Sequence, residues 1–308
     1  MTQASLPSRL WTYQAERFPL FKHGLLIAVF SGGEAVFGAL VRGSAPDWRA
    51  VAVAVVVCLL LFAQLRIADE HKDHQDDCRW RPERPVPRGL VSLKELRAVG
   101  VAAAVVQIAA TALLDIRLTL LLLLVWGWMA LMSVEFFAPA WLKARPVTYL
   151  ISHMMVMPLI ALFAVACGTR AEVLIHPAVG VFLALAFLNG LVLEVARKCW
   201  APADEREGVE TYSRLWGMRR SAAVVTVAGL SAAGLAWIIQ ALLSLPWGFA
   251  LMVAVGAAWL VVSALRYVRQ ATTKAATRLE TASGLFVLVI YLAVAWLPAV
   301  QWMWGGVA

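Results

Sequence analysis

Acidic residues are concentrated in two short segments of this chain. Seven of the 19 Asp and Glu residues lie between residues 66 and 97, the first acidic segment, and five lie between residues 194 and 220, the second acidic segment. In the first, Glu70, Asp73 and Asp77 are spaced by three and then four residues, and Asp69 precedes Asp73 by four. A helix through this segment would place the four carboxylates on one face.

Carboxylates that lie this close on one helix face repel one another, and a bound cation would offset the repulsion. Like charges at this spacing destabilise a helix by roughly 0.2–0.5 kcal/mol per pair. Magnesium is the natural candidate, because it takes hard oxygen ligands, is usually held by one or two carboxylates, and completes its shell with water and phosphate oxygens. Taken alone, the first acidic segment is equally consistent with a solvated loop of mixed charge.

The second acidic segment repeats the arrangement. Residues 194–217 read EVARKCWAPADEREGVETYSRLWG, with carboxylates beside cations, Pro202 to break a helix and Gly208 to allow a turn. Two such segments brought together could clamp two metal ions and an anion that the metals share. A diphosphate fits this role, since metals and basic side chains together neutralise its charge.

The rest of the chain is strongly apolar. Its 308 residues are 62% hydrophobic and 15% charged, with a mean hydropathy of +0.76, which excludes an ordinary soluble domain. We therefore expect an all-α, polytopic membrane protein in which residues 1–308 form a single integral-membrane domain. Nine runs approach the roughly 20 residues needed to cross a bilayer: residues 20–41, 50–67, 96–115, 118–137, 147–167, 177–195, 221–243, 247–265 and 284–297. The short gaps at 116–117 and 244–246 predict two tight helical hairpins.

The basic residues predict an orientation. All but four of the 27 Lys and Arg residues fall in loops on the N-terminal side of such a bundle, the exceptions being Arg42, Arg49, Arg117 and Arg170. The positive-inside rule then places the N-terminus and both acidic segments in the cytoplasm and the C-terminus outside, as in a bacterial inner membrane. The net charge of +8 reflects this bias and does not indicate nucleic-acid binding. The four cysteines lack CxxC spacing, so neither a disulfide nor a cysteine zinc site is expected.

Taken together, the two segments resemble the motifs of the UbiA superfamily of intramembrane prenyltransferases. Asp69, Glu70, Asp73 and Asp77 form DExxDxxxD where the superfamily has NDxxDxxxD, and RPERPVPRG at residues 81–89 is similar to the segment that follows that motif. Ser92 and Glu95 then form a capping-box pattern. In the second acidic segment, Asp204, Gly208 and Thr211 match the usual D-x-x-x-G-x-x-T ending, although a plain DxxxD is missing.

The resemblance implies a UbiA-like bundle of nine helices around a central cavity and a reaction that ionises a geranyl, farnesyl or geranylgeranyl diphosphate. Its catalytic residues would be Asp69, Glu70, Asp73, Asp77 and Lys72; its Mg²⁺ ligands Asp69, Glu70, Asp73, Asp77, Glu194, Asp204 and Glu205; and its diphosphate contacts Arg66, Lys72, Arg79, Lys198, Arg197 and Tyr212. Lys72 would offset the repulsion between Glu70 and Asp73 and then turn towards the leaving group.

Two outcomes of such a reaction stay open. The prenyl group could pass to an aromatic, quinone-precursor or other small acceptor, or the allylic cation could cyclise as in UbiA-type terpene cyclases. Two other classes fit less well: the continuous motif of CDP-alcohol phosphotransferases is missing, and a transporter would place its charges along a path rather than at helix ends.

Several polar residues outside the motifs have more than one interpretation. His71 and His74 are expected to be solvated loop residues, because magnesium prefers oxygen ligands. His153, Glu34 and Glu135 fall in apolar runs, where an ionisable group is either functional or held by a partner.

Overall fold

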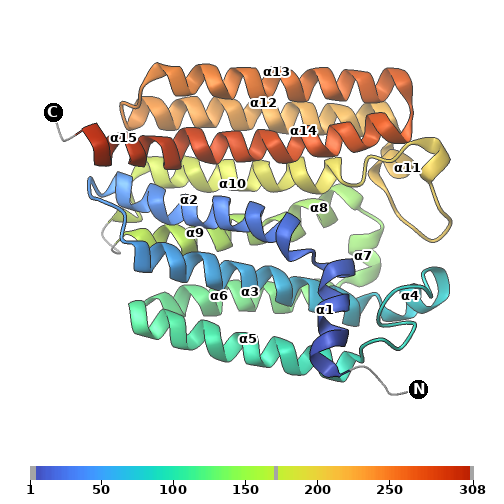
Figure 1. The fold of residues 1–308 in the computed structure, drawn as a ribbon. Helices are drawn as coiled ribbons and strands as arrows, with labels where there is room; N and C mark the ends of the chain where they lie inside the picture. The colour runs from blue at the N-terminus through green and yellow to red at the C-terminus, as the bar shows by residue number, and fades with distance from the viewer. Residues whose placement is uncertain (1–4, 170–172, 306–308) are drawn as a thin grey trace.

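The protein is a bundle of roughly parallel helices (Figure 1). The structure, a computed structural model, describes residues 5–169 and 173–305, so Arg170 lies outside the described residues. No β-strand occurs in these ranges. The helices are α1 (Leu6–Arg17), α2 (Leu25–Val41), α3 (Trp48–Lys72), α4 (His74–Trp80), α5 (Leu93–Leu114), α6 (Leu118–Ser133), α7 (Pro139–Lys143), α8 (Pro146–Met154), α9 (Val156–Gly168), α10 (Pro177–Ala196), α11 (Tyr212–Trp216), α12 (Met218–Leu242), α13 (Trp247–Gln270), α14 (Thr273–Tyr291) and α15 (Leu297–Gly305).

The prediction of a polytopic all-helical membrane protein is confirmed. Within the described residues, seven helical stretches are long and apolar enough to cross a membrane, and two shorter apolar helices, Leu25–Val41 and Leu118–Ser133, coincide with two further predicted spans. Many large apolar side chains point outwards, as a lipid-facing surface requires. Both predicted hairpins are present, because α5 and α6 are joined across residues 115–117 and α12 and α13 across residues 243–246.

Several predicted spans were too short, because the helices continue into polar residues beyond the apolar runs. Helix α3 continues past residue 67 to Lys72, and α14 begins at Thr273 rather than at residue 284. Thr272 accepts the backbone N–H of Ala275 and so caps α14. The predicted capping box of α5 is confirmed: the side chains of Ser92 and Glu95 each accept the other's backbone N–H.

The core of the bundle depends on close helix contacts at glycine. A Cβ on Gly168 would collide with the backbone of Ala35, and one on Gly38 would collide with the carbonyl of Val165. Helices α2 and α9 therefore pack backbone against backbone, as small residues allow in membrane proteins. This contact holds α2 directly against α9 within the bundle (Figure 1).

The polar elements gather at one end of the bundle. Helices α1, α4, α7 and α11 lie at that end, whereas α15 lies at the other (Figure 1). Helix α1 crosses the bundle there, and two ion pairs attach it to the first acidic segment: Arg9 to Glu95 at 2.6 Å and Glu16 to Arg88 at 2.6 Å. Both acidic segments thus face the same side, as the sequence predicts.

Candidate active site

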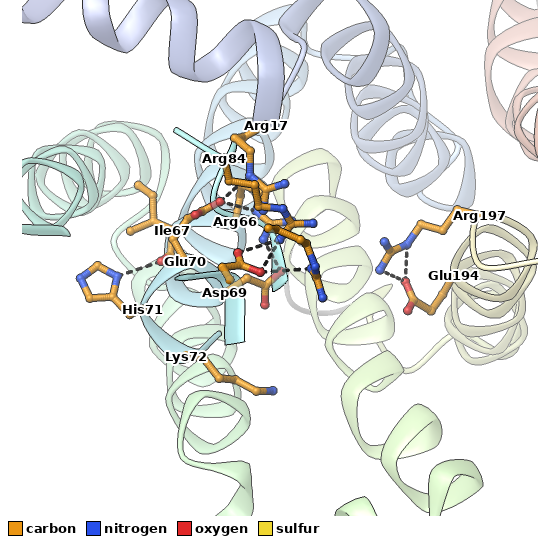
Figure 2. A network of polar contacts seen from close by, with 12 residues as sticks. Arg17, Arg66, Ile67, Asp69, Glu70, His71, Lys72, Arg84, Glu194 and Arg197 are labelled. Atoms are coloured by element: carbon orange, nitrogen blue, oxygen red, sulfur yellow. Dashed lines mark hydrogen bonds and ion pairs between the residues drawn. The ribbon is translucent and has the colours of Figure 1, made fainter. Parts of the chain in front are cut away.

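Glu70 is held by two arginines at the polar end of α3. Its side chain is 1% exposed, and its Oε1 lies 2.6 Å from Nε of Arg17 and 3.5 Å from Nε of Arg66. These contacts appear at the centre of Figure 2. Arg17, 53 residues away, is the nearest cation to Glu70. Of the two carboxylates whose repulsion Lys72 was expected to offset, Lys72 acts on Asp73, where it partly opposes the rise in pKa.

Asp77 is also enclosed by arginines. Helix α3 ends at Lys72, Asp73 follows with φ of −92° and ψ of 7°, and Asp77 lies on the separate short helix α4. Its side chain is 2% exposed, with Arg84 at 2.7 Å and Arg81 at 3.1 Å. The prediction of one continuous helical face for all four carboxylates is therefore wrong at Asp77. Removing a partner from such a buried pair would leave an uncompensated charge.

Of the four motif carboxylates Asp69, Glu70, Asp73 and Asp77, Asp69 and Asp73 are the two that arginines do not enclose. Asp69 is 52% exposed, and its one ion pair in the described part of the chain is the 3.5 Å contact with Arg66. Asp73 is half-buried and makes no side-chain hydrogen bond or ion pair with another described residue. Burial, followed by the neighbouring Asp69 carboxylate, raises the pKa of Asp73, and Lys72 partly opposes this. A bound cation would relieve this unfavourable charge.

Lys72 points away from Glu70 into a polar cluster with Glu135 and Tyr149. Its Nζ lies 2.7 Å from Oε1 of Glu135 and donates to the Tyr149 hydroxyl at 2.5 Å, and that hydroxyl donates to Glu135 at 3.2 Å. Glu135 opens a 3-10 turn, Glu135–Phe137, whose three residues all have φ between 51° and 58°. Backbone in this region is costly for such side chains, so the surrounding contacts must hold it.

Carboxylates of the second acidic segment are mostly bound within that segment. Glu194 accepts from Arg197 and from Lys198, whose Nζ is 3.1 Å away. Glu205 accepts from the hydroxyls of Thr211 and Ser213, each at 2.7 Å. Glu205 therefore orders the loop that leads into α11.

Asp204 and Tyr212 have equally specific surroundings. The hydroxyl of Thr273 donates to Asp204 at 3.0 Å and so ties the second acidic segment to α14. The buried ring of Tyr212 lies 5.4 Å from Nζ of Lys198. Tyr212 is thus beside one of the predicted diphosphate contacts.

The two acidic segments meet, as the sequence predicts. Gly208 has φ of +72°, and a Cβ there would collide with the Trp80 ring, so the turn packs directly against α4. The guanidinium of Arg79 lies over the Trp80 ring, 4.7 Å from the ring centre. Electrostatic coupling also joins the segments: Glu194 first, and then Asp69, hold the pKa of Arg197 above its usual range. Figure 2 shows Glu194 and Arg197 across from Asp69.

The donor set fits magnesium through a smaller group of ligands than the sequence predicts. In residues 5–169 and 173–305, no cluster of three or more His, Cys, Asp or Glu side chains is close enough to hold a metal by itself. Asp69 and Asp73 lie one helical turn apart at the end of α3, unlike Glu70 and Asp77, whose carboxylates are paired to arginine. One or two carboxylates with water and phosphate oxygens are what Mg²⁺ usually takes in substrate complexes.

The polar residues outside the motifs, among them His71, His74 and Glu34, lie in different surroundings. His74 lies 3.8 Å from the Sγ of the exposed Cys78, whereas His71 lines a cavity rather than a solvated loop. Glu34 is buried, with the Tyr291 hydroxyl 3.1 Å away, and all four cysteines are free. Sequence reasoning missed Arg17 and Tyr149, whose partners Glu70 and Lys72 lie 53 and 77 residues away in the chain, and it also missed Arg84, whose partner Asp77 lies seven residues away.

Comparisons with known proteins agree with this geometry. The sequence profile of the UbiA prenyltransferase family matches residues 25–290. Over 203 residues the chain is 31% identical to a digeranylgeranylglyceryl phosphate synthase of Methanopyrus kandleri, covering 64% of this chain and 69% of the relative. Among solved structures, a UbiA homolog from Aeropyrum pernix K1 superposes with a TM-score of 0.65 at 17% identity, covering 87% of this chain and 96% of that one.

A second solved structure, of a digeranylgeranylglyceryl phosphate synthase, superposes with a TM-score of 0.60 at 14% identity and covers 96% of this chain and 99% of its own. At these identities the two structures establish the fold, while the profile and the archaeal relative establish the family. The chain belongs to the UbiA prenyltransferase family and is an intramembrane prenyltransferase.

Proposed function

We propose that the protein transfers a prenyl group from an isoprenoid diphosphate to an acceptor, with the diphosphate held by Mg²⁺ between the two acidic segments. The observation that carries this proposal is the pair of open carboxylates, Asp69 and Asp73, with Arg197 of the second acidic segment across from Asp69 and electrostatically coupled to it. Carboxylates alone would repel a diphosphate. A site that bound the diphosphate with basic side chains alone would not need carboxylates. Their juxtaposition favours an anion that would be held jointly by cations and by a metal bound to the carboxylates.

The chain's own residues divide the work of ionisation. Asp69 and Asp73 would hold Mg²⁺, which when bound supplies charge neutralisation on the diphosphate. Arg197 and Lys198 donate hydrogen bonds to its oxygens, and Lys72 lies at the neighbouring edge of the site. As the bond between C1 and the diphosphate oxygen breaks, the electron pair leaves on the diphosphate. The acceptor then forms the new bond to C1, and its proton passes to the released diphosphate.

Glu70, Asp77 and Glu205 have supporting roles in this proposal. Arg17 and Arg66 fix Glu70 at the end of α3, and Arg81 and Arg84 fix Asp77 on α4. Each pair keeps one wall of the site rigid while leaving Asp69 and Asp73 free. Asp204 and Glu205 keep the opposite loop in place through hydroxyl groups.

Transfer and cyclisation are separated by product analysis. Purified protein given geranylgeranyl or farnesyl diphosphate with Mg²⁺ is expected to form a prenylated product that depends on an added acceptor. The archaeal relative is named for a product built on glyceryl phosphate, which makes a glyceryl phosphate lipid the first acceptor to test, followed by an aromatic quinone precursor. A cyclic terpene formed without any acceptor would instead establish the terpene cyclase alternative.

We also propose that the polar end of the bundle faces the cytoplasm, because nearly all basic residues gather there. Cys78 is exposed at this end and the other three cysteines are buried, so it serves as a single natural reporter. An impermeant maleimide should label Cys78 in inside-out vesicles and leave it unlabelled in right-side-out vesicles, with Cys78→Ser as the blank. Labelling from the outer side would reverse the orientation.

A further inference from the structure

The ionisable side chain of His153 lies inside the bundle and takes no part in the chemistry proposed above. It belongs to the last turn of α8, within the predicted span 147–167, and is half-buried. An ionisable group at membrane depth is costly, so it is kept either for a function or by a partner. The contacts of its two ring nitrogens distinguish these cases.

The hydrogen bonds of His153 determine which ring nitrogen carries the proton. Nδ1 lies 2.9 Å from the carbonyl oxygen of Tyr149, which can only accept, so Nδ1 must donate. The hydroxyl of Ser152, 3.3 Å from Nδ1, donates to the same carbonyl at 3.0 Å. Nε2 is buried and has no hydrogen-bond partner in the described part of the chain. The neutral ring therefore presents an unused lone pair on Nε2.

Aromatic contacts hold the His153 ring in this orientation. The Tyr149 ring stacks on it, with the centroids 3.9 Å apart and the planes at 11°. The Phe136 ring makes an edge contact at a centroid distance of 5.9 Å. Phe136 is the middle residue of the Glu135–Phe137 turn, whose left-handed backbone is costly. The turn thus supports His153 as well as the cluster around Lys72.

A small cavity of about 20 Å³ lies beside His153, between α3, α6 and α8. That volume holds one water-sized group such as a hydroxyl, which needs at least roughly 10–15 Å³. Four side chains supply its polar lining: Asp69, Lys72, Ser133 and His153. Asp69 is one of the two carboxylates proposed to hold Mg²⁺ and, through it, the diphosphate. A hydroxyl in this cavity would therefore lie near C1 of the prenyl group.

Nε2 of His153 is the group on this cavity that is free to take a proton. Lys72 is cationic and can only donate. The hydroxyl of Ser133 donates to the Met129 carbonyl at 2.9 Å and is a far weaker base than imidazole. Asp69 would be engaged by the metal, and it makes no hydrogen bond or ion pair with His153 in the described ranges.

We propose that His153 is the general base of prenyl transfer and that Nε2 takes the proton of an acceptor hydroxyl. As the hydroxyl oxygen bonds to C1, its O–H bond breaks, the electron pair of that bond stays on the oxygen, and the proton moves to Nε2. The imidazolium then gives the proton to the released diphosphate, and the ring is neutral again. The inference rests on the proposed function, to which it adds the route of the proton.

The test compares prenyl transfer with ionisation in one variant. Transfer is followed with geranylgeranyl diphosphate, Mg²⁺ and 1-O-octadecylglycerol phosphate as acceptor probe. Ionisation is followed without acceptor, as movement of ¹⁸O from the bridge to C1 into the non-bridging positions of the diphosphate. His153→Asn keeps a side-chain donor for the Tyr149 carbonyl and removes Nε2. It should lower kcat for transfer by about 10²–10⁴ and leave the rate of ¹⁸O movement within about threefold.

The matched control is His176→Asn at the opposite end of the bundle. His176 caps α10 by accepting the backbone N–H of Ala178, and Asn caps equally well, so both rates should stay near those of the wild type.

Chemical rescue tests the role of the base directly. The small cavity shares four lining residues with a larger, open cavity of about 580 Å³, which gives free imidazole a path to it. Imidazole should raise transfer by His153→Ala at least about tenfold, because it replaces the missing base. It should not raise transfer by His153→Phe, whose ring fills the space. A purely structural role for His153 would not produce this difference.

The outcomes separate this inference from the proposed function. A wild type that shows no ¹⁸O movement, or that prenylates no acceptor, contradicts the proposed function itself. If the wild type does both, transfer by His153→Asn at the wild-type rate would show that His153 is not the base. Equal losses of transfer and ¹⁸O movement would show that His153 supports ionisation or folding instead. A His153→Ala variant that imidazole leaves unchanged would also overturn the inference.

Discussion

Asp73→Asn is expected to lower the rate of diphosphate release from geranylgeranyl diphosphate by about 10³-fold or more. Asp73 has no protein partner in the described part of the chain, and its charge is disfavoured by burial and by Asp69, so the cation that it binds would supply most of its stabilisation. Several kcal/mol of charge stabilisation by a metal corresponds to this factor, at about 1.4 kcal/mol per tenfold.

The control is Asp76→Asn, which removes an exposed carboxylate three residues away from the same segment. This variant should keep nearly full activity and the same thermal midpoint in detergent. An Asp73→Asn protein that remained active would show that Asp73 is not a metal ligand. We expect the thermal midpoint of Asp73→Asn to be unchanged, because Asp73 makes no ion pair that holds the described helices together. An unchanged midpoint would show that the loss of activity does not come from unfolding.

Lys72→Met is expected to lower kcat by about 10²–10³, the scale for removing one preorganised electrostatic donor. Lys72 is also the ion-pair partner of Glu135, at 2.7 Å, so the single variant leaves a buried carboxylate without a cation, with only the Tyr149 hydroxyl donating to it. The double variant Lys72→Met/Glu135→Gln removes that charge and separates the two roles. If Lys72 assists the leaving group, the double variant stays slow.

Recovery of kcat in the double variant would give the opposite answer. Lys72 would then serve only to neutralise Glu135 and hold the turn Glu135–Phe137, and its catalytic assignment would be wrong. Thermal unfolding measures the structural role of Lys72 separately. The single variant should be less stable than the double variant. A rise in KM at constant kcat would indicate uniform substrate binding.

Local sequence signals predicted much of the fold. The apolar runs, the two short hairpin gaps and the Ser92–Glu95 capping box each depend on residues close in the chain, and each is present in the structure. Boundaries were less predictable, because hydropathy ends where the first charges begin, whereas α3 continues as a helix to Lys72. The helix break at Asp73 separates Asp77 from the other carboxylates, and no proline or glycine at this position indicates it in the sequence.

The partners of the motif residues could not be predicted in the same way. Arg17 reaches Glu70 across 53 residues, and Tyr149 reaches Lys72 across 77, so only the folded chain brings them together. The left-handed backbone of Glu135, Phe136 and Phe137 contains no glycine or asparagine that would indicate it. The sequence identified which residues could carry the chemistry, and the structure distinguishes the open carboxylates from those that arginines already bind.

The central claim is that Asp69 and Asp73 would hold the Mg²⁺ that neutralises the substrate diphosphate. Its most direct test is Mn²⁺ binding followed by electron paramagnetic resonance, with Mn²⁺ in place of Mg²⁺ and with a non-hydrolysable geranylgeranyl diphosphate analogue added. The account predicts bound Mn²⁺ in the wild type and in Asp76→Asn, tightened by the analogue, and loss of that signal in Asp73→Asn. Equal Mn²⁺ binding by wild type and Asp73→Asn, or no effect of the analogue on binding, would contradict it.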